Sequence, residues 1–169
     1  MTEDKNQILA VLTASQPRRW LGISMLITLG LLLIWTSFAA AGAFVWQAAF
    51  LVFGLASLAG AERMRRATEA RIELTRDVLR SSTGEVLARV ENISRVERGA
   101  FAFKPSNGFL VRLHAPEGKG AWRPGLWWRR GTFLGVGGVV PGGQSRAMAE
   151  VLTALTLGEH TLAGDADDN

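Results

Sequence analysis

Apolar residues are gathered into one long stretch near the start of the chain. No Asp, Glu, Lys, Arg or His occurs from Trp20 to Ala61, a run of 42 residues. Because a helix crosses the hydrocarbon core of a bilayer with about 20 apolar residues, this run is long enough for two spans. We expect helical spans over 20–39 and 43–60, joined by a very short turn. The predicted element is therefore an antiparallel transmembrane hairpin.

The second span carries small residues that would let the two helices approach closely, as packing inside membranes favours. These residues are Ala49, Gly54, Ala56, Ser57 and Gly60. Gln47 is the one strongly polar side chain in the spans. Its amide either bonds to the partner helix or lies near the membrane interface.

Arginines flank the hairpin on both sides, and its turn has none. Arg18 and Arg19 precede the first span, and the segment 61–71 (AERMRRATEAR) follows the second. Because segments rich in Lys and Arg remain in the cytoplasm, we expect a two-span protein of the bacterial inner membrane with both termini cytoplasmic. Residues 61–71 are expected to continue the second helix as a basic juxtamembrane helix. Its arginines either contact anionic lipid headgroups or act only as a topology signal; they include Arg63, Arg65 and Arg66.

The N-terminal segment, residues 1–19, is expected in the cytoplasm. It is polar apart from the apolar run Ile8–Leu12. That run predicts either a small interfacial helix ending before Pro17 or a frayed terminus.

Residues 72–158 change in character, because short apolar runs alternate with turn residues. The pair Asn107-Gly108 separates Ala100–Phe103 from the alternating run Phe109–Leu113, which is a strong hairpin signal. We expect six or seven short antiparallel strands in this region. The sequence then predicts a small α+β domain in which one helix covers the open face of the sheet.

That covering helix is predicted over 144–157 from its apolar stripe. Ala147, Met148, Val151, Leu152 and Leu155 recur at helical spacing. We expect Ser145 to cap the start of the helix and Gly158 to close its end. The acidic tail, residues 159–169, is expected to be disordered.

Two segments of the domain resemble the bacterial pleckstrin-homology-like membrane proteins. Arg71–Thr75 with Val78–Arg80 is similar to the first strand pair of that family, and Val86–Val96 (VLARVENISRV) is similar to the strand and turn that follow. The resemblance covers about 72–157, and the two spans agree with it in arrangement. Residues 122–143 depart from the family pattern, so the register of the last strands stays open. The resemblance implies a PH-like fold, an antiparallel sheet or partial barrel with one C-terminal helix. It also implies a non-catalytic role in assembling membrane complexes, as in a relative that assists assembly of photosynthetic reaction centres.

Known catalytic patterns do not occur in the sequence. There is no cysteine, and no Gly-Lys-Ser/Thr triplet of a phosphate-binding loop. The dinucleotide pattern G-x-G-x-x-G begins at Gly135 but has Val140 in place of its third glycine. His114 and His160 stand in separate segments with no shared metal site evident. We therefore expect no enzyme activity, cofactor or metal.

The most distinctive segment of the domain, residues 122–130, interleaves tryptophan with arginine. A net charge of +4 for the whole chain is small for binding nucleic acid, which requires a large basic field. Tryptophan and arginine together are typical of protein contact hot spots and of membrane interfaces. A structural role in a hairpin is a further alternative. The contact candidates are Trp122, Arg123, Trp127, Trp128, Arg129 and Arg130.

These observations predict a non-enzymatic accessory or assembly protein of the inner membrane. Its cytoplasmic domain is expected to dock on an integral membrane protein complex, for example of respiratory or photosynthetic type. The alternative is a module that binds the headgroups of anionic membrane lipids.

Overall fold

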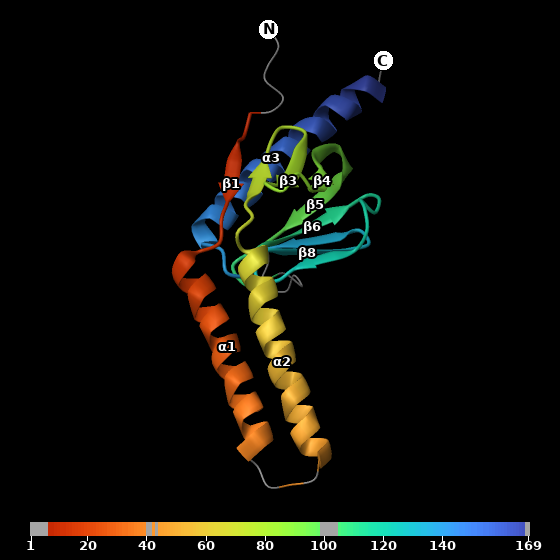
Figure 1. The fold of residues 1–169 in the computed structure, drawn as a ribbon. Helices are drawn as coiled ribbons and strands as arrows, with labels where there is room; N and C mark the ends of the chain where they lie inside the picture. The colour runs from red at the N-terminus through yellow and green to blue at the C-terminus, as the bar shows by residue number, and fades with distance from the viewer. Residues whose placement is uncertain (1–6, 40–41, 43, 99–104, 168–169) are drawn as a thin grey trace.

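The computed structural model describes residues 7–39, 42, 44–98 and 105–167, with side chains as far as residue 158. A hairpin of two long apolar helices is followed by two antiparallel sheets and a C-terminal helix (Figure 1). We call the part built from both sheets and the last helix the two-sheet domain. The predicted architecture, a helical hairpin followed by an α+β domain, is confirmed.

The hairpin consists of α1 (Gln16–Ala39) and α2 (Phe44–Ala67), each of 24 residues. The predicted spans fall within these helices, except for residue 43, which lies outside the described residues. Pro17 stands in the first turn of α1, where its missing N–H breaks no helical hydrogen bond. Helix α2 runs on past the apolar stretch to Ala67, so the predicted continuation of the second helix is confirmed as far as that residue.

Both helices are long and apolar enough to cross a membrane, with mean hydropathies of 2.0 and 1.7 over their most apolar windows. Only 17% and 11% of these windows are buried. A core helix of a soluble protein would bury most of the same residues. Large apolar side chains such as Leu31, Phe38 and Phe53 are instead exposed, which fits helices surrounded by lipid.

The two helices are in closest contact at Gly30 and Gly54. A Cβ added at Gly54 would lie 2.9 Å from the carbonyl oxygen of Gly30 and 2.6 Å from Cγ1 of Ile34. Of the small residues singled out in the sequence, Gly54 therefore allows the close approach, whereas a Cβ at Gly60 would meet nothing within 4 Å. Nearer the turn, Ser37 Oγ donates a 2.8 Å hydrogen bond to the backbone carbonyl of Gln47.

The N-terminal segment contributes a strand to the domain. Strand β1 (Ala10–Leu12) pairs antiparallel with β2 (Ile72–Leu74), and Leu12 is fully buried. The expectation of an interfacial helix or a frayed end is wrong for these residues. Strand β1 covers the edge of β2, which would otherwise expose unpaired backbone groups.

The first sheet has the order β1-β2-β3-β4, with β3 at Val78–Ser81 and β4 at Val86–Arg89. A short 3-10 turn, η1 (Val90–Asn92), leads into the second sheet. That sheet contains β5 (Ile93–Glu97), β6 (Phe109–Leu113), β7 (Ala121–Arg123), β8 (Trp127–Arg130) and β9 (Phe133–Val136).

The second sheet has the order β5-β6-β9-β8-β7. The register left open by the sequence is set by β9, which pairs with both β6 and β8. Asn107 adopts a positive φ of 53° in the predicted turn, and β6 follows it as expected. The strand expected over 100–103 lies outside the described residues, and β6 pairs with β5 instead. Between residues 72 and 158 the described part of the chain contains eight strands rather than six or seven.

Helix α3 (Gly142–Asp167) covers the core between the edge strands β1 and β5. Met148 and Leu152 of the predicted apolar stripe are fully buried in this core. The predicted bounds are wrong at both ends. Ser145 lies inside the helix rather than at its cap, and the helix continues through Gly158, so residues 159–167 are helical rather than disordered. Residues 168–169 lie outside the described residues.

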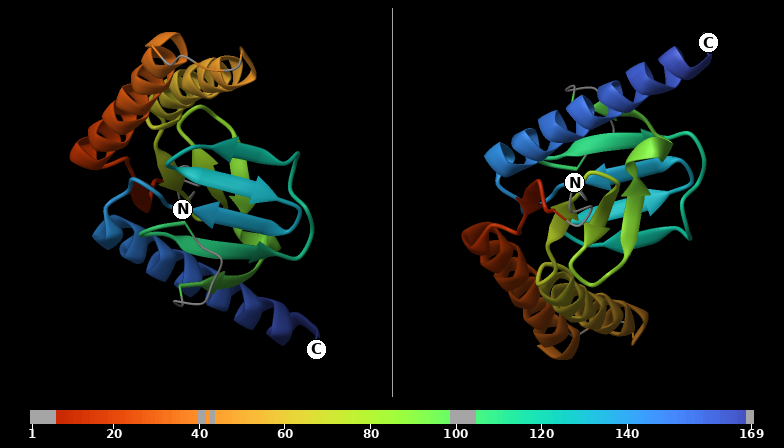
Figure 2. Two further views of the ribbon diagram at one scale, coloured as in Figure 1. Left: turned by 90° about the horizontal axis from the view of Figure 1, so that it is seen from below. Right: turned by 90° about the horizontal axis from the view of Figure 1, so that it is seen from above.

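The two sheets lie at different distances from the hairpin. Viewed from the hairpin side, the second sheet is seen face on; viewed from the opposite side, the first sheet lies in front (Figure 2). The core therefore lies between the sheets, and the outer face of the second sheet is turned toward the side on which the hairpin extends. Backbone contacts hold this arrangement, including the 2.7 Å hydrogen bond from Ser15 N–H to the Val139 carbonyl.

Candidate functional site

The tryptophan–arginine segment forms strands β7 and β8, and strand alternation divides it into a buried and an exposed half. Trp127 and Arg129 point into the domain and are 2% and 7% exposed. Trp128 and Arg130 point outward from the same strand, as does Trp122 from β7. Trp127 and Arg129 therefore face the interior of the domain, whereas Trp122, Trp128 and Arg130 lie on its surface.

Arg129 instead joins the two sheets from within. Its guanidinium donates hydrogen bonds to the carbonyls of Val86 at 2.9 Å and Leu87 at 3.3 Å, both in β4. A third bond, of 3.2 Å, goes from Nε to the Lys119 carbonyl, and Glu85 lies 3.5 Å away. The guanidinium carbon also lies 5.7 Å from the ring centroid of Trp127. Buried arginine requires this many partners, because an unpaired charge in the interior is costly.

The exposed half contributes to an apolar surface that we call the outer sheet face. Trp122 and Trp128 are paired across β7 and β8. The indole of Trp128 lies over Gly135, where an added Cβ would come within 2.3 Å of its Nε1. Since only glycine leaves room for the ring there, Gly135 sets the position of Trp128. The outer sheet face consists of Leu110, Arg112, Trp122, Trp128, Arg130 and Phe133.

Two arginines of the outer sheet face lie beside its aromatic residue Phe133. The Arg112 guanidinium lies 5.2 Å from the ring centroid of Phe133, within the range of a cation–π contact. Arg130 is exposed beside the same ring, because it is paired with Phe133 across β8 and β9. No described helix covers the outer sheet face, which is turned toward the hairpin side (Figure 2).

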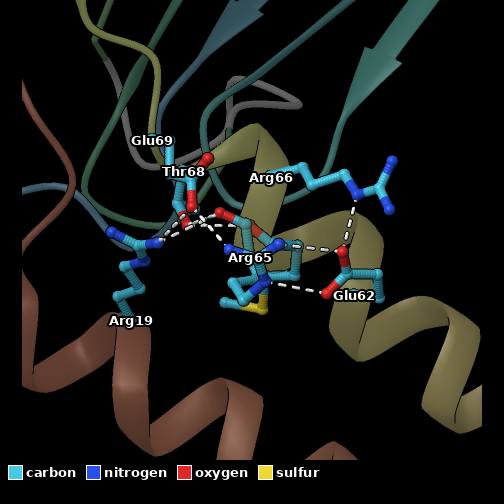
Figure 3. Close-up of polar contacts among 7 residues, drawn as sticks. Arg19, Glu62, Arg65, Arg66, Thr68 and Glu69 are labelled. Carbon is cyan, nitrogen blue, oxygen red and sulfur yellow. Dashed lines mark hydrogen bonds and ion pairs between the residues drawn. The ribbon is translucent and has the colours of Figure 1, made fainter.

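Of the juxtamembrane arginines of α2, Arg65 and Arg66 form ion pairs with nearby glutamates, whereas Arg63 forms none with the described residues. Glu62 lies two residues past Gly60, outside the predicted span, and accepts hydrogen bonds from Arg65 at 2.8 Å and Arg66 at 2.6 Å (Figure 3). These bonds lower the pKa of Glu62 to about 2, so its carboxylate stays ionised at neutral pH. The same bond from Arg65 raises the pKa of that guanidinium.

Arg65 also connects the two helices of the hairpin. It lies 2.7 Å from Glu69, and Arg19 of α1 lies 3.5 Å from the same carboxylate (Figure 3). Arg19 donates a further bond, of 3.2 Å, to the Arg65 carbonyl. These contacts give Arg65 a structural role. Arg63 makes no ion pair with any residue in the described part of the chain.

The structure brings the two sets of predicted residues together in one cavity, which the sequence did not indicate. The cavity has a volume of about 180 Å³ and lies between the end of α2 and the turn that joins β7 to β8. Arg63 and Arg66 line it from the helix, and Trp122 and Arg123 line it from the strand. We call it the arginine cavity. Arg65 and Arg130 do not line it.

The described residues of the domain give little support for a metal site or a phosphate-binding loop. Among the described residues, no group of three His, Asp or Glu side chains could hold a metal ion. The glycines after β9 form turns: Gly137 and Gly138 have φ of 147° and 124° and pack against the backbone at Gly108 and Gly125. This close packing accounts for the glycine-rich segment without a phosphate-binding loop.

No protein-family model, no curated protein and no solved structure matches this chain.

Proposed function

We propose that this chain is a non-enzymatic accessory or assembly protein of the bacterial inner membrane, of the pleckstrin-homology-like kind. Both termini lie in the cytoplasm, and the two-sheet domain docks on an integral membrane protein complex. The order of elements supports this proposal: two apolar helices, antiparallel sheets and a C-terminal helix. The arginines that flank the hairpin support the orientation.

The outer sheet face is the observation that carries the docking proposal. Trp122 is 64% exposed and Phe133 is 36% exposed on a sheet face that none of the described helices covers. Buried tryptophan and arginine supply much of the binding energy at protein interfaces, and large apolar patches are uncommon on monomers. A partner that meets this face carries acidic side chains to pair with Arg112 and Arg130.

The position of the outer sheet face favours a partner in the membrane. The outer sheet face is turned toward the hairpin side of the domain, near the level at which α1 begins and α2 ends (Figures 1 and 2). A protein that emerges from the membrane beside the hairpin would reach it directly. A soluble partner would approach more easily from the first sheet, on the opposite side of the domain.

Site-specific photo-crosslinking in native membranes tests the docking proposal. A benzophenone amino acid at Phe133 is expected to capture an integral membrane protein that the same group at Val86, on the first sheet, does not capture. Val86 is a matched control, because this residue is 39% exposed against 36% for Phe133.

The captured protein must also depend on the rest of the face. Arg130→Glu is expected to abolish the crosslink from position 133 and co-purification of the same protein in mild detergent. Lipid adducts alone at position 133, or equal capture from position 86, would refute the docking proposal.

Binding of lipid headgroups is the second candidate function. The arginine cavity favours it, because three cationic side chains meet there beside the helix that leaves the predicted span. The arginine cavity and the outer sheet face are adjacent and share Trp122, but the arginines of the cavity are not those of the face.

A further inference from the structure

The arginine cavity has the chemistry of an anion site. Arg63, Arg66 and Arg123 line it, and no acidic side chain is among its described lining residues. Ser81 and Thr83 line the cavity from the end of β3 and the turn after it. Their hydroxyl oxygens lie 2.9 Å apart and share one hydrogen bond, so the pair keeps one hydroxyl hydrogen for a further acceptor.

Two of the three arginines are positioned by carboxylates outside the cavity. Arg66 uses Nε to bond Glu62 at 2.6 Å, and Arg123 uses one Nη to meet Glu85 at 3.5 Å. A guanidinium has five N–H donors, so each arginine keeps donors for a ligand. Arg63 has no carboxylate partner among the described residues, and the cavity therefore has a net positive charge.

The size and location of the arginine cavity restrict which anion it can bind. Sites for drug-sized ligands and cofactors measure about 300–1,000 Å³, whereas this cavity measures about 180 Å³. A group of the size of a phosphate fits better than a nucleotide. Arg63 comes three residues after Gly60, which ends the predicted span. In the membrane orientation of the proposed function, on which this inference rests, the cavity lies at the level of the phosphates of the cytoplasmic leaflet.

We propose that the arginine cavity binds the phosphate of an anionic phospholipid headgroup. Arg63 supplies the uncompensated charge, Arg66 and Arg123 donate hydrogen bonds from opposite walls, and the Ser81–Thr83 hydroxyl pair closes one end. Trp122, exposed at the rim, provides the amphipathic ring that is typical of membrane interfaces. The bound lipid would fix the domain relative to the membrane surface.

Lipid retention by the purified full-length protein tests this proposal. The protein is reconstituted into vesicles with equal parts of phosphatidylglycerol and phosphatidylcholine, extracted in mild detergent, and its retained lipids are quantified by mass spectrometry. The variants are Arg63→Gln and Arg123→Gln. Arg95→Gln is the matched control, because Arg95 is exposed on β5, at the opposite edge of the same sheet from β7.

Wild type and Arg95→Gln are expected to retain phosphatidylglycerol in preference to phosphatidylcholine. Each cavity variant is expected to lower this preference about fivefold, the usual effect of one arginine at an anionic membrane surface. Equal preference in all four proteins would overturn the proposal. Circular dichroism of each variant shows whether the fold is retained, and Arg123→Gln leaves Glu85 paired with Arg129.

A second arm distinguishes a lipid from free phosphate. Inorganic phosphate is added to the extracted protein at the same ionic strength as a chloride control. Retention of phosphatidylglycerol in both salts supports a lipid site, and so does its loss in phosphate alone, because phosphate displaces the lipid only from a site that the lipid occupies. If wild type and Arg63→Gln retain equal phosphatidylglycerol in chloride and only wild type binds inorganic phosphate, the cavity is assigned to a soluble anion and the lipid assignment is overturned. Because no partner protein is present, the outcome does not depend on docking by the outer sheet face.

Discussion

Substitution of Arg129 tests whether this arginine has a structural role, in contrast to Arg130, its neighbour on β8. Arg129 is buried, and its guanidinium holds β8 against β4 through the carbonyls of Val86 and Leu87. Arg130 is its neighbour in sequence but is exposed on the opposite face. We expect Arg129→Ala to destabilise the domain and Arg130→Ala to leave its stability almost unchanged.

The size of the destabilisation depends on which carbonyl acceptors lose their hydrogen bond from Arg129. The bond to Leu87 is fully buried, and an unsatisfied buried carbonyl costs about 1–3 kcal/mol. The bonds to Val86 and Lys119 are partly exposed, so water replaces much of their energy. Glu85 stays paired with Arg123. With the lost packing on Trp127, the free energy of unfolding falls by about 3 kcal/mol.

Heating the full-length protein in mild detergent measures this effect through tryptophan fluorescence, to which the buried Trp127 contributes. A loss of about 3 kcal/mol lowers Tm by about 6–12 °C for a chain of this size, and exposed substitutions stay within about 0.5 kcal/mol. Arg129→Lys should also be destabilising, because an ammonium lacks the planar fork that reaches both strand carbonyls. If Arg129→Ala and Arg130→Ala melt at the same temperature, the structural role assigned to Arg129 is incorrect.

Two further predictions concern the hairpin and the N-terminal strand. Gly54→Leu should prevent close helix packing, because even its Cβ would lie 2.9 Å from the Gly30 carbonyl oxygen. Size-exclusion chromatography should then show aggregation of this variant. Gly60→Leu is the control and should not aggregate, because a Cβ at that position meets nothing within 4 Å. Leu12→Ala should cost about 2–5 kcal/mol, as for other fully buried leucines. The exposed Val11→Ala should cost far less in the same thermal assay, and equal losses would mean that β1 does not belong to the core.

Local sequence patterns were sufficient where one physical requirement decides the outcome. A bilayer requires about 20 apolar residues per span, so the uncharged run from Trp20 to Ala61 predicted both long helices. The apolar stripe of α3 likewise predicted the burial of Met148 and Leu152. The ends of α3 were not predicted, because the preferences of serine and glycine for helix ends are weak and do not by themselves fix where a helix begins or ends.

The sequence was less informative where the outcome depends on contacts between distant residues. The short apolar run that forms β1 has no periodicity long enough to distinguish a strand from a helix. Its partner β2 lies some sixty positions away, with the whole hairpin in between. Only the folded arrangement, in which the hairpin returns the chain to its starting point, brings the two strands together.

In the tryptophan–arginine segment, the sequence predicted the alternation of side chains, and the tertiary structure decided which of them are buried. Its composition indicated a distinctive segment, and alternation along β8 requires that neighbouring side chains point to opposite faces. Which face is buried depends on the position of the other sheet, so the sequence could not separate Trp127 and Arg129 from Trp128 and Arg130. The arginine cavity depends even more on tertiary structure. Arg63 and Arg123 are 60 residues apart and meet because α2 ends beside the turn between β7 and β8.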